Sequence, residues 1–168
     1  MTRKKYSIFH TLMQKIGSTR AGALFFSKTQ PHLDRFLLKL TRGKTNLTGL
    51  LSGLPVVLLT SRGAKSGLLR TTPLIGIYDQ SGNDKIALIA SNYGQGHHPA
   101  WYYNLKVNPQ VSCAINGKAG KYAAYEAQGQ EYNSYWQAAS DLYLGFPKYQ
   151  VQAGDRHIPI MVLSPIKE

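Results

Sequence analysis

The sequence is poor in cysteine, in acidic residues and in long apolar runs, and each shortage excludes a class of protein. One cysteine, Cys113, leaves no disulfide framework and no paired-cysteine metal knuckle, so a reducing cytoplasm is the natural setting. Only 8 Asp and Glu residues argue against hydrolysis by paired carboxylates. No apolar run approaches the roughly 18 residues that a membrane span requires.

Familiar nucleotide-binding and catalytic signatures are also missing. The chain has no GxxxxGK[ST] phosphate loop, no GxGxxG turn opening a helix and no GxSxG. Its five histidines include the neighbours His97 and His98, but none has HxxxH or HxH spacing, so we expect no metal site. The N-terminal apolar residues are interrupted by polar ones such as Gln14 and Lys15, so we expect no export signal.

What the chain has in excess is positive charge. Twenty Lys and Arg residues give a net charge of +12. Such an imbalance favours an anionic partner, which could be a phosphorylated cofactor, an acidic membrane surface or a nucleic acid. No RNP, KH or zinc signature supports nucleic acid, so a basic nucleic-acid-binding module stays only as the alternative from another functional class.

The most informative stretch runs from Val56 to Leu74. Val56–Leu59 is a short apolar run typical of a buried strand, and 68–74 returns as a second strand. Between them, residues 62–67 (RGAKSG) combine two glycines with two cations and a hydroxyl. Backbone amides of a glycine-bearing turn can face one concavity, where Lys and Arg supply charge for a phosphate. The sequence therefore predicts an anion site here, with an ordinary basic hairpin loop as the alternative.

Upstream of this stretch the pattern predicts two helices. In the first, an apolar stripe predicts either packing on the core or contact with an anionic membrane. A second helix is predicted to start at Pro31 and end near Gly43, and 46–53 is predicted to be a loop. The first stripe is Tyr6, Phe9, Leu12, Met13 and Ile16, and the buried face expected for the second helix is Leu33, Phe36, Leu37 and Leu40.

Downstream, apolar alternation and turn signals predict more strands than helices. Further strands are predicted at 86–90, 111–115, 118–128 and 158–163, and further helices at 99–108 and 131–142. Asn116-Gly117 predicts a type I′ hairpin turn, and 144–155 is predicted to be irregular. We therefore expect an α+β fold with a mainly antiparallel sheet of about six strands, curled into a barrel. We divide it into an N-terminal helical segment, 1–53, and a barrel, 54–168, within one structural domain.

Five sequence blocks give the chain a family resemblance. LLTSRGAKSGLLRTTPL, ALIASNYG, HPAWYYNLKVNPQV, FPKYQ and DRHIPIMVL follow one another in the order seen in deazaflavin-dependent nitroreductases. The chain resembles that family from about Val56 to its end, and more loosely before it. The resemblance implies a split β-barrel that binds coenzyme F420 and passes hydride from its reduced form to a quinone, a nitroaromatic or a similar electrophile. A split barrel that binds FMN, haem or a lipid is the alternative on the same fold.

The resemblance also assigns site residues. It implies that the segment holding the cofactor's phosphate and tail is Ala64, Lys65, Ser66, Arg70, Thr71, Thr72, Pro73 and Leu74. The strand end beside the ring is implied to be Ile89, Ala90, Ser91 and Asn92. The helix start that covers the ring is implied to be Ala100, Trp101, Tyr102, Tyr103 and Asn104. Tyr149 matches an aromatic residue near the reacting face. Tyr149 and Ser91 are the candidates for orienting the substrate or delivering a proton.

Two places depart from the family pattern: Asn92-Tyr93-Gly94 replaces the commoner small or basic residues after the strand, and the phosphate loop, which usually reads GRKSG, is altered. Ala64 stands where the arginine would be, and Arg62 is the nearby cation that could replace it. The expected partners are a small-molecule electron acceptor and, through the N-terminal helix, an anionic membrane. We expect a cytoplasmic protein, peripheral at the inner face of the cell membrane if that helix binds lipid, and either a monomer or a homodimer.

Overall fold

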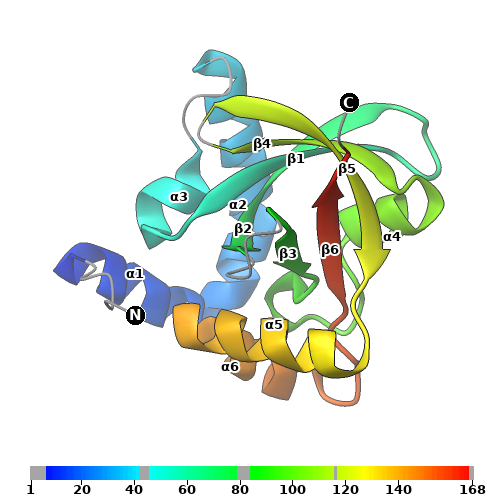
Figure 1. The fold of residues 1–168 in the computed structure, drawn as a ribbon. Helices are drawn as coiled ribbons and strands as arrows, with labels where there is room; N and C mark the ends of the chain where they lie inside the picture. The colour runs from blue at the N-terminus through cyan, green and yellow to red at the C-terminus, as the bar shows by residue number, and fades with distance from the viewer. Residues whose placement is uncertain (1–6, 42–45, 79–83, 116, 167–168) are drawn as a thin grey trace.

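The computed structural model describes residues 7–41, 46–78, 84–115 and 117–166, and its sheet is a closed barrel of six antiparallel strands (Figure 1). The strand order is β1-β2-β3-β6-β5-β4. The strands are β1 Val56–Arg62, β2 Leu69–Tyr78, β3 Ile86–Ile89, β4 Gln110–Ile115, β5 Lys118–Glu126 and β6 Ile160–Pro165. The predicted α+β fold with a mainly antiparallel barrel is confirmed. The predicted hairpin turn rests on Asn116, which lies outside the described residues.

Buried side chains, which alternate with less buried ones along β1, fill the interior of the barrel. Val57, Leu59 and Ser61 of β1 are buried while their neighbours are less so, and all four residues of β3 are buried. Leu88 of β3 packs in the same apolar cluster as Leu59, and Trp101 of the helix that follows the loop after β3 joins them. Burial on both faces explains why β3 is a continuous apolar run instead of an alternating one.

Helices cover the barrel from the side and from below (Figure 1). They are α1 Ile8–Gly17, α2 Arg20–Leu40, α3 Leu47–Ser52, α4 Ala100–Val107, α5 Gly129–Leu142 and α6 Gly145–Ala153, with the short 3-10 helix η1 Asn92–Gly94. In the view of Figure 1, α5 and α6 lie beneath the barrel, α1 to α3 lie to its left and behind it, and α4 lies on its right.

The prediction for the second helix was wrong in both its start and its buried face. The helix begins at Arg20, where the Thr19 hydroxyl accepts a hydrogen bond of 3.1 Å from the Gly22 amide as an N-cap. Leu33 and Phe36 are exposed, as is Leu40, whereas Asp34 on the same helix is buried. The Asp34 carboxylate accepts hydrogen bonds from the Leu47 and Thr48 amides at 2.6 and 3.2 Å. The inward-facing residue of this helix is therefore a carboxylate that caps α3. The segment 46–53, predicted to be a loop, contains the helix α3.

The segment 144–155, predicted to be irregular, contains the helix α6 and so corrects a second prediction. Two side chains of α6 form hydrogen bonds with Ser18, which lies between α1 and α2. The Lys148 ammonium donates to the Ser18 hydroxyl at 3.0 Å, and the Gln152 side-chain amide donates to the Ser18 carbonyl at 3.3 Å. Residues 130 or more positions apart make these contacts, so no local pattern around Pro147 could reveal them.

The amphipathic N-terminal helix is present, but most of its apolar stripe does not pack on the core. Phe9 and Leu12 are each about half exposed and Ile16 is 42% exposed, while Tyr6 lies outside the described residues. Met13 is only partly exposed and lines a cavity described below. The core-packing alternative is therefore wrong for the greater part of the stripe. Among the helices that the structure describes, none is both long and apolar enough to cross a membrane.

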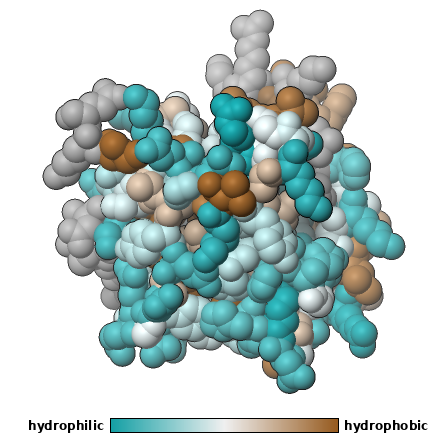
Figure 2. Space-filling view, turned by 90° about the vertical axis from the view of Figure 1, so that its right-hand side faces the viewer, coloured by the Kyte–Doolittle hydropathy of each residue, from teal (hydrophilic) through white to brown (hydrophobic). Residues whose placement is uncertain are grey.

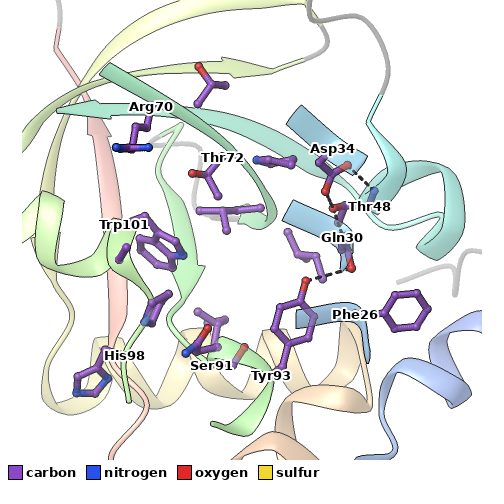
Figure 3. Close-up of a pocket in the computed structure, with 18 of the residues that line it drawn as sticks. Phe26, Gln30, Asp34, Thr48, Arg70, Thr72, Ser91, Tyr93, His98 and Trp101 are labelled. Atoms are coloured by element: carbon purple, nitrogen blue, oxygen red, sulfur yellow. Dashed lines mark hydrogen bonds between the residues drawn. The ribbon is translucent and has the colours of Figure 1, made fainter. Parts of the chain in front are cut away.

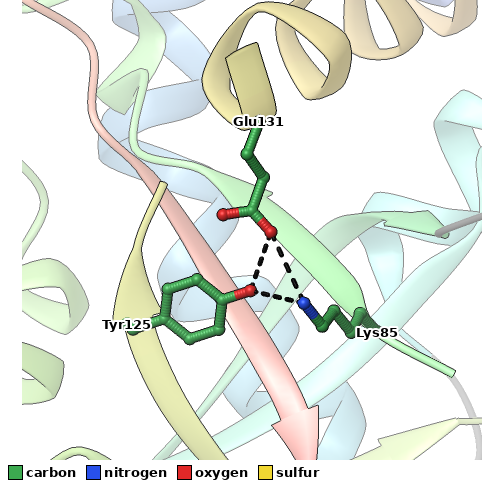
Figure 4. Close-up of polar contacts among 3 residues, drawn as sticks. All are labelled: Lys85, Tyr125 and Glu131. Atoms are coloured by element: carbon green, nitrogen blue, oxygen red, sulfur yellow. Dashed lines mark hydrogen bonds and ion pairs between the residues drawn. The ribbon is translucent and has the colours of Figure 1, made fainter. Parts of the chain in front are cut away.

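A polar cluster joins α5 to the barrel (Figure 4). The Tyr125 hydroxyl of β5 donates to Glu131 at 2.8 Å and accepts from the Lys85 ammonium at 2.8 Å, and that ammonium lies 3.5 Å from the Glu131 carboxylate. Glu131 stands in the first turn of α5, where a carboxylate also favours the helix dipole. The cluster connects β5, α5 and the start of β3 on the surface.

Candidate active site

A cavity of about 1400 Å³ lies between the helices α1 to α3 and the barrel (Figure 3). Its walls come from segments far apart in the sequence: α1, α2 and α3, the loop between β1 and β2, β2 itself, the end of β3, the start of α4 and α6. The cavity is larger than most pockets for drug-sized ligands, which measure about 300–1,000 Å³. All of the predicted site residues line it except Ala90 and Tyr102.

One wall is the glycine-bearing loop between β1 and β2. The Gly63 amide donates to the Leu68 carbonyl at 2.9 Å, and the Gly67 amide donates to the Gly63 carbonyl at 2.8 Å. A side chain at Gly63 would place its Cβ 2.5 Å from the Ser66 hydroxyl, and Gly67 has a φ of 68°, a conformation that favours glycine. Within the described residues, the Lys65 and Ser66 amides have no hydrogen-bond partner. They are therefore free to bind an anion.

The cations of this wall are similarly unpaired. Lys65 and Arg70 are exposed and line the cavity, and neither forms an ion pair with a carboxylate in the described part of the chain. Arg62 behaves differently, since its guanidinium donates to the Gly67 carbonyl at 2.9 Å and does not line the cavity. The suggestion that Arg62 replaces the missing arginine at Ala64 is therefore not supported, because the Arg62 guanidinium bonds to the backbone of the loop itself and is not part of the cavity lining.

Asn104 of α4 fixes the loop in place. Its side chain is 8% exposed, and its Oδ1 accepts a hydrogen bond of 2.9 Å from the Ala64 amide. Its Nδ2 donates to the Ser61 hydroxyl at 3.4 Å. Asn104 was predicted to bind the cofactor, and the structure shows it positioning the loop that carries Lys65. The alanine side chain at 64 leaves this backbone contact intact.

The adjoining wall is formed by the end of β3 and the start of α4. Ile89, Ser91 and Trp101 lie here, and the Ser91 hydroxyl makes no hydrogen bond with any described residue. Ala90 is buried in the core instead. The Tyr102 hydroxyl donates to Glu126 at 3.1 Å, away from the cavity, and burial followed by that carboxylate raises the pKa of Tyr102.

Tyr149 lines the cavity, but its hydroxyl is already occupied. It is 4% exposed, donates to the Gly17 carbonyl at 2.8 Å and lies 3.1 Å from the Tyr143 hydroxyl. Burial, and next the neighbouring Tyr143, raises the pKa of Tyr149, so the hydroxyl keeps its proton. Tyr149 also stands on the helix α6 and not on a mobile loop. Its ring can contact a ligand, whereas its hydroxyl joins α6 to the end of α1.

Two groups of residues, one lining the cavity and one beside it, were missed from the sequence. The first is a chain of hydrogen bonds on the helical side (Figure 3). The Tyr93 hydroxyl donates to Gln30 at 3.0 Å, and the Gln30 amide donates to Thr48 at 2.5 Å. The Thr48 hydroxyl donates to the Asp34 carboxylate at 2.7 Å. These residues come from three separate elements, so no spacing in the sequence could have joined them.

The second group surrounds Arg156, which follows α6. Its guanidinium donates to the carbonyls of Gln95 and Ser91 at 2.7 and 2.5 Å, and to that of Ala90 at 3.3 Å. It also contacts Nδ1 of His98 at 3.0 Å. The DRHIP block contains this arginine, but nothing in the block predicts that it holds a loop more than 55 residues upstream.

Comparison with known proteins agrees with this geometry. The F420H(2)-dependent quinone reductase family model matches residues 35–165. The F420H(2)-dependent quinone reductase Rv1261c of Mycobacterium tuberculosis is 34% identical over 113 residues, covering 66% of this chain and 73% of that protein.

Two solved structures are also similar. One is an F420-H2 dependent reductase, FDR-A, with 38% identity and a TM-score of 0.59, covering 66% of this chain and 94% of the other. The second is described as a domain-swapped dimer, with 33% identity and a TM-score of 0.60, covering 77% and 96%. The chain therefore belongs to the F420H(2)-dependent quinone reductase family, which makes it an oxidoreductase with coenzyme F420 as its cofactor.

Proposed function

We propose that this chain reduces a quinone with hydride from reduced F420, and that the reaction takes place in the cavity between α1–α3 and the barrel. The observation that supports this most directly is that one cavity has both a cationic wall and an apolar, aromatic wall. One wall offers free amides and unpaired cations, and the other is buried and aromatic. A ligand with an anionic tail and a flat ring fits this pairing.

The residues present fit the cofactor. We assign the phosphate and tail to the Lys65 and Ser66 amides and to the side chains of Lys65 and Arg70. We assign the ring to the wall of Ile89 and Trp101. When bound, reduced F420 supplies a hydride to the acceptor. The protein's part is to orient the ring and exclude water, with the free Ser91 hydroxyl available to align the acceptor and the Tyr149 ring closing the wall.

The helical side of the cavity suits an apolar acceptor such as a quinone. Phe26, Leu51 and Leu54 line it beside Met13. Met13, Phe26 and Leu51 come from the helices α1, α2 and α3, and Leu54 follows α3, so the helical segment contributes directly to the site. A flat apolar quinone would bury its ring here, whereas a highly charged acceptor would lose hydration without compensation.

The test of the anion site is a double substitution, Lys65→Ala with Arg70→Ala. Charge-assisted hydrogen bonds contribute about 1.5–3 kcal/mol each, so F420 affinity should fall by about 100-fold or more. Titration of F420 fluorescence measures this. Lys28→Ala with Lys118→Ala removes the same charge elsewhere on the surface and serves as the control. Equal affinity in both double variants would remove the loop from the site, and no menadione reduction by the wild type would overturn the proposed function.

We also propose that the exposed helical face contacts an anionic membrane. Ile8, Phe9 and Leu12 of α1 are exposed together with Phe25 of α2. The side of the molecule turned away from α1 is largely hydrophilic (Figure 2). A net charge of +12 favours an anionic lipid surface over a second copy of the same charge.

The membrane test keeps α1 folded and changes only its face. Phe9→Ser with Leu12→Ser should abolish co-sedimentation with phosphatidylglycerol liposomes, because both side chains are exposed and their loss leaves the core intact. Val107→Ser with Ile166→Ser changes exposed apolar residues elsewhere and should leave it unchanged. Equal sedimentation of the two double variants would contradict membrane contact through α1.

A further inference from the structure

Arg156 makes an unusual set of contacts for a cation. Its three guanidinium nitrogens bind three backbone carbonyls and one imidazole nitrogen, and no carboxylate pairs with it in the described residues. The carbonyls belong to the end of β3 and the loop after it, where Asn92 and Tyr93 both have positive φ, at 48° and 55°. Non-glycine residues rarely adopt this conformation, so the arginine holds a strained loop.

The contact with His98 determines where the histidine carries its proton. A guanidinium has only donors, so Nδ1 of His98 must accept the 3.0 Å hydrogen bond from Arg156 and carry no proton itself. A neutral imidazole has one protonated nitrogen, which must then be Nε2. Burial, and next the Arg156 charge, lowers the pKa of His98, which favours the neutral ring.

His98 and Ser91 lie at the same place in the cavity. Both line it, and a single guanidinium binds the Ser91 carbonyl and the His98 ring. Figure 3 shows both on the side of the cavity that carries Trp101. Among the described residues, Nε2 of His98 has no hydrogen-bond partner. A protonated nitrogen without a partner is thus available at the wall assigned to the ring.

We propose that His98, positioned by Arg156, donates its Nε2–H to the carbonyl oxygen of the quinone, an inference that rests on the proposed function. Hydride delivered to one carbonyl oxygen of the quinone forms an O–H bond there, and the displaced π electrons pass through the ring to the second oxygen, which becomes a phenolate-type anion. A solvent proton then completes the hydroquinone. The neutral imidazole donates a hydrogen bond to that oxygen and keeps its own proton, and the nearby arginine charge favours the oxygen anion.

The role of Arg156 is to position this donor. Without the arginine, the imidazole could carry its proton on either nitrogen, and the strained loop would lose three carbonyl contacts. Arg156→Lys keeps the charge but not the forked geometry, and Arg156→Met removes both. Both variants should therefore lower kcat, with the lysine variant the less impaired.

The first experiment examines the unliganded full-length chain by ¹⁵N NMR of the histidine side chains. In the wild type, Nε2 of His98 should be the protonated nitrogen and Nδ1 the acceptor. In Arg156→Met the two tautomers should mix. Protonation of Nδ1 in the wild type would overturn the proposal, and so would an unchanged tautomer in Arg156→Met.

The second experiment uses two amides of different reach. His98→Gln places an N–H near the position of Nε2, whereas the shorter His98→Asn reaches only the position of Nδ1. His98→Asn should lower kcat for menadione on the order of 10- to 100-fold with F420 affinity nearly unchanged, and His98→Gln should recover most of the loss. Wild-type kcat in His98→Asn would overturn this inference alone, since the wild type would still be a quinone reductase.

Discussion

At the scale of single residues, Tyr149 and Asn104 line the cavity, but their polar groups are already used within the protein. Both were expected to contact the cofactor, and both side chains form hydrogen bonds to other parts of the chain. Tyr149 joins α6 to Gly17, and Asn104 joins α4 to the loop at Ala64. A polar group that is buried and already paired contributes mainly by fixing its partners.

For Tyr149 we expect that loss of the hydroxyl lowers stability more than activity. Tyr149→Phe leaves the buried Gly17 carbonyl without its donor, which costs about 1–3 kcal/mol. Thermal denaturation should therefore shift down by several degrees, with kcat for menadione within about twofold. Tyr125→Phe, which removes a hydroxyl from the surface cluster, is the matched control and should change Tm little. A large loss of kcat at unchanged Tm would restore the predicted catalytic role.

For Asn104 we expect an effect on cofactor affinity that is transmitted through the loop. Asn104→Ala removes the acceptor of the Ala64 amide and so loosens the residues that carry the free amides. F420 affinity should fall on the order of 10-fold, since one partly buried hydrogen bond contributes about 1 kcal/mol or somewhat more. Asn108→Ala, in an exposed contact with the Arg62 carbonyl, is the control. Fluorescence titration that gives both variants wild-type affinity would show that the loop needs no such support.

At the scale of elements, the helical layer depends on one buried carboxylate. The Asp34 carboxylate of α2 accepts hydrogen bonds from two backbone amides at the start of α3 and from the Thr48 hydroxyl. The hydrogen bond between Tyr93 and Gln30 connects this group to η1. A helix of six residues would not form alone, so its stability must come from such contacts. The layer that covers the cavity therefore depends on a residue outside the cofactor wall.

We expect Asp34→Ala to loosen α3 selectively. Two partly buried amides would lose their acceptor, which should lower the free energy of unfolding by about 2–4 kcal/mol. Hydrogen exchange should rise first in 46–53 and leave the barrel strands protected. Asp141→Asn, at an exposed position that contacts Gln137, should have no such effect. Uniform exchange across the barrel and helices in Asp34→Ala would contradict a local role.

At the scale of the whole molecule, the positive charge and the cavity act on different ligands. The net charge of +12 attracts an anionic cofactor over long range, whereas a neutral quinone is bound by short-range apolar contacts. Salt screens the electrostatic attraction of the cofactor but not the apolar contacts of the quinone, because the Debye length falls from about 10 Å at 0.1 M to about 3 Å at 1 M.

Raising the salt concentration from 50 to 500 mM should therefore weaken F420 binding several-fold while KM for menadione, measured at saturating F420, changes little. Fluorescence titration and steady-state kinetics at each concentration measure the two effects separately. The Lys65→Ala, Arg70→Ala variant should show a smaller salt dependence than the wild type. An F420 affinity independent of salt would contradict the assignment of its tail to the cationic loop.

The sequence by itself determined the barrel and one side of the cavity, formed by the loop between β1 and β2, β2 itself, the end of β3 and the start of α4. The β-branched run at Val56, the glycines of the loop and the apolar block at Ile86 specify strands through local preferences, and the resemblance across the later blocks assigned residues that do line one cavity. Only the tertiary structure decided how Asp34, Tyr149 and Arg156 are used. Their partners lie 13, 132 and about 60 residues away, and hydrogen bonds across such separations form only once the barrel has brought the helices together.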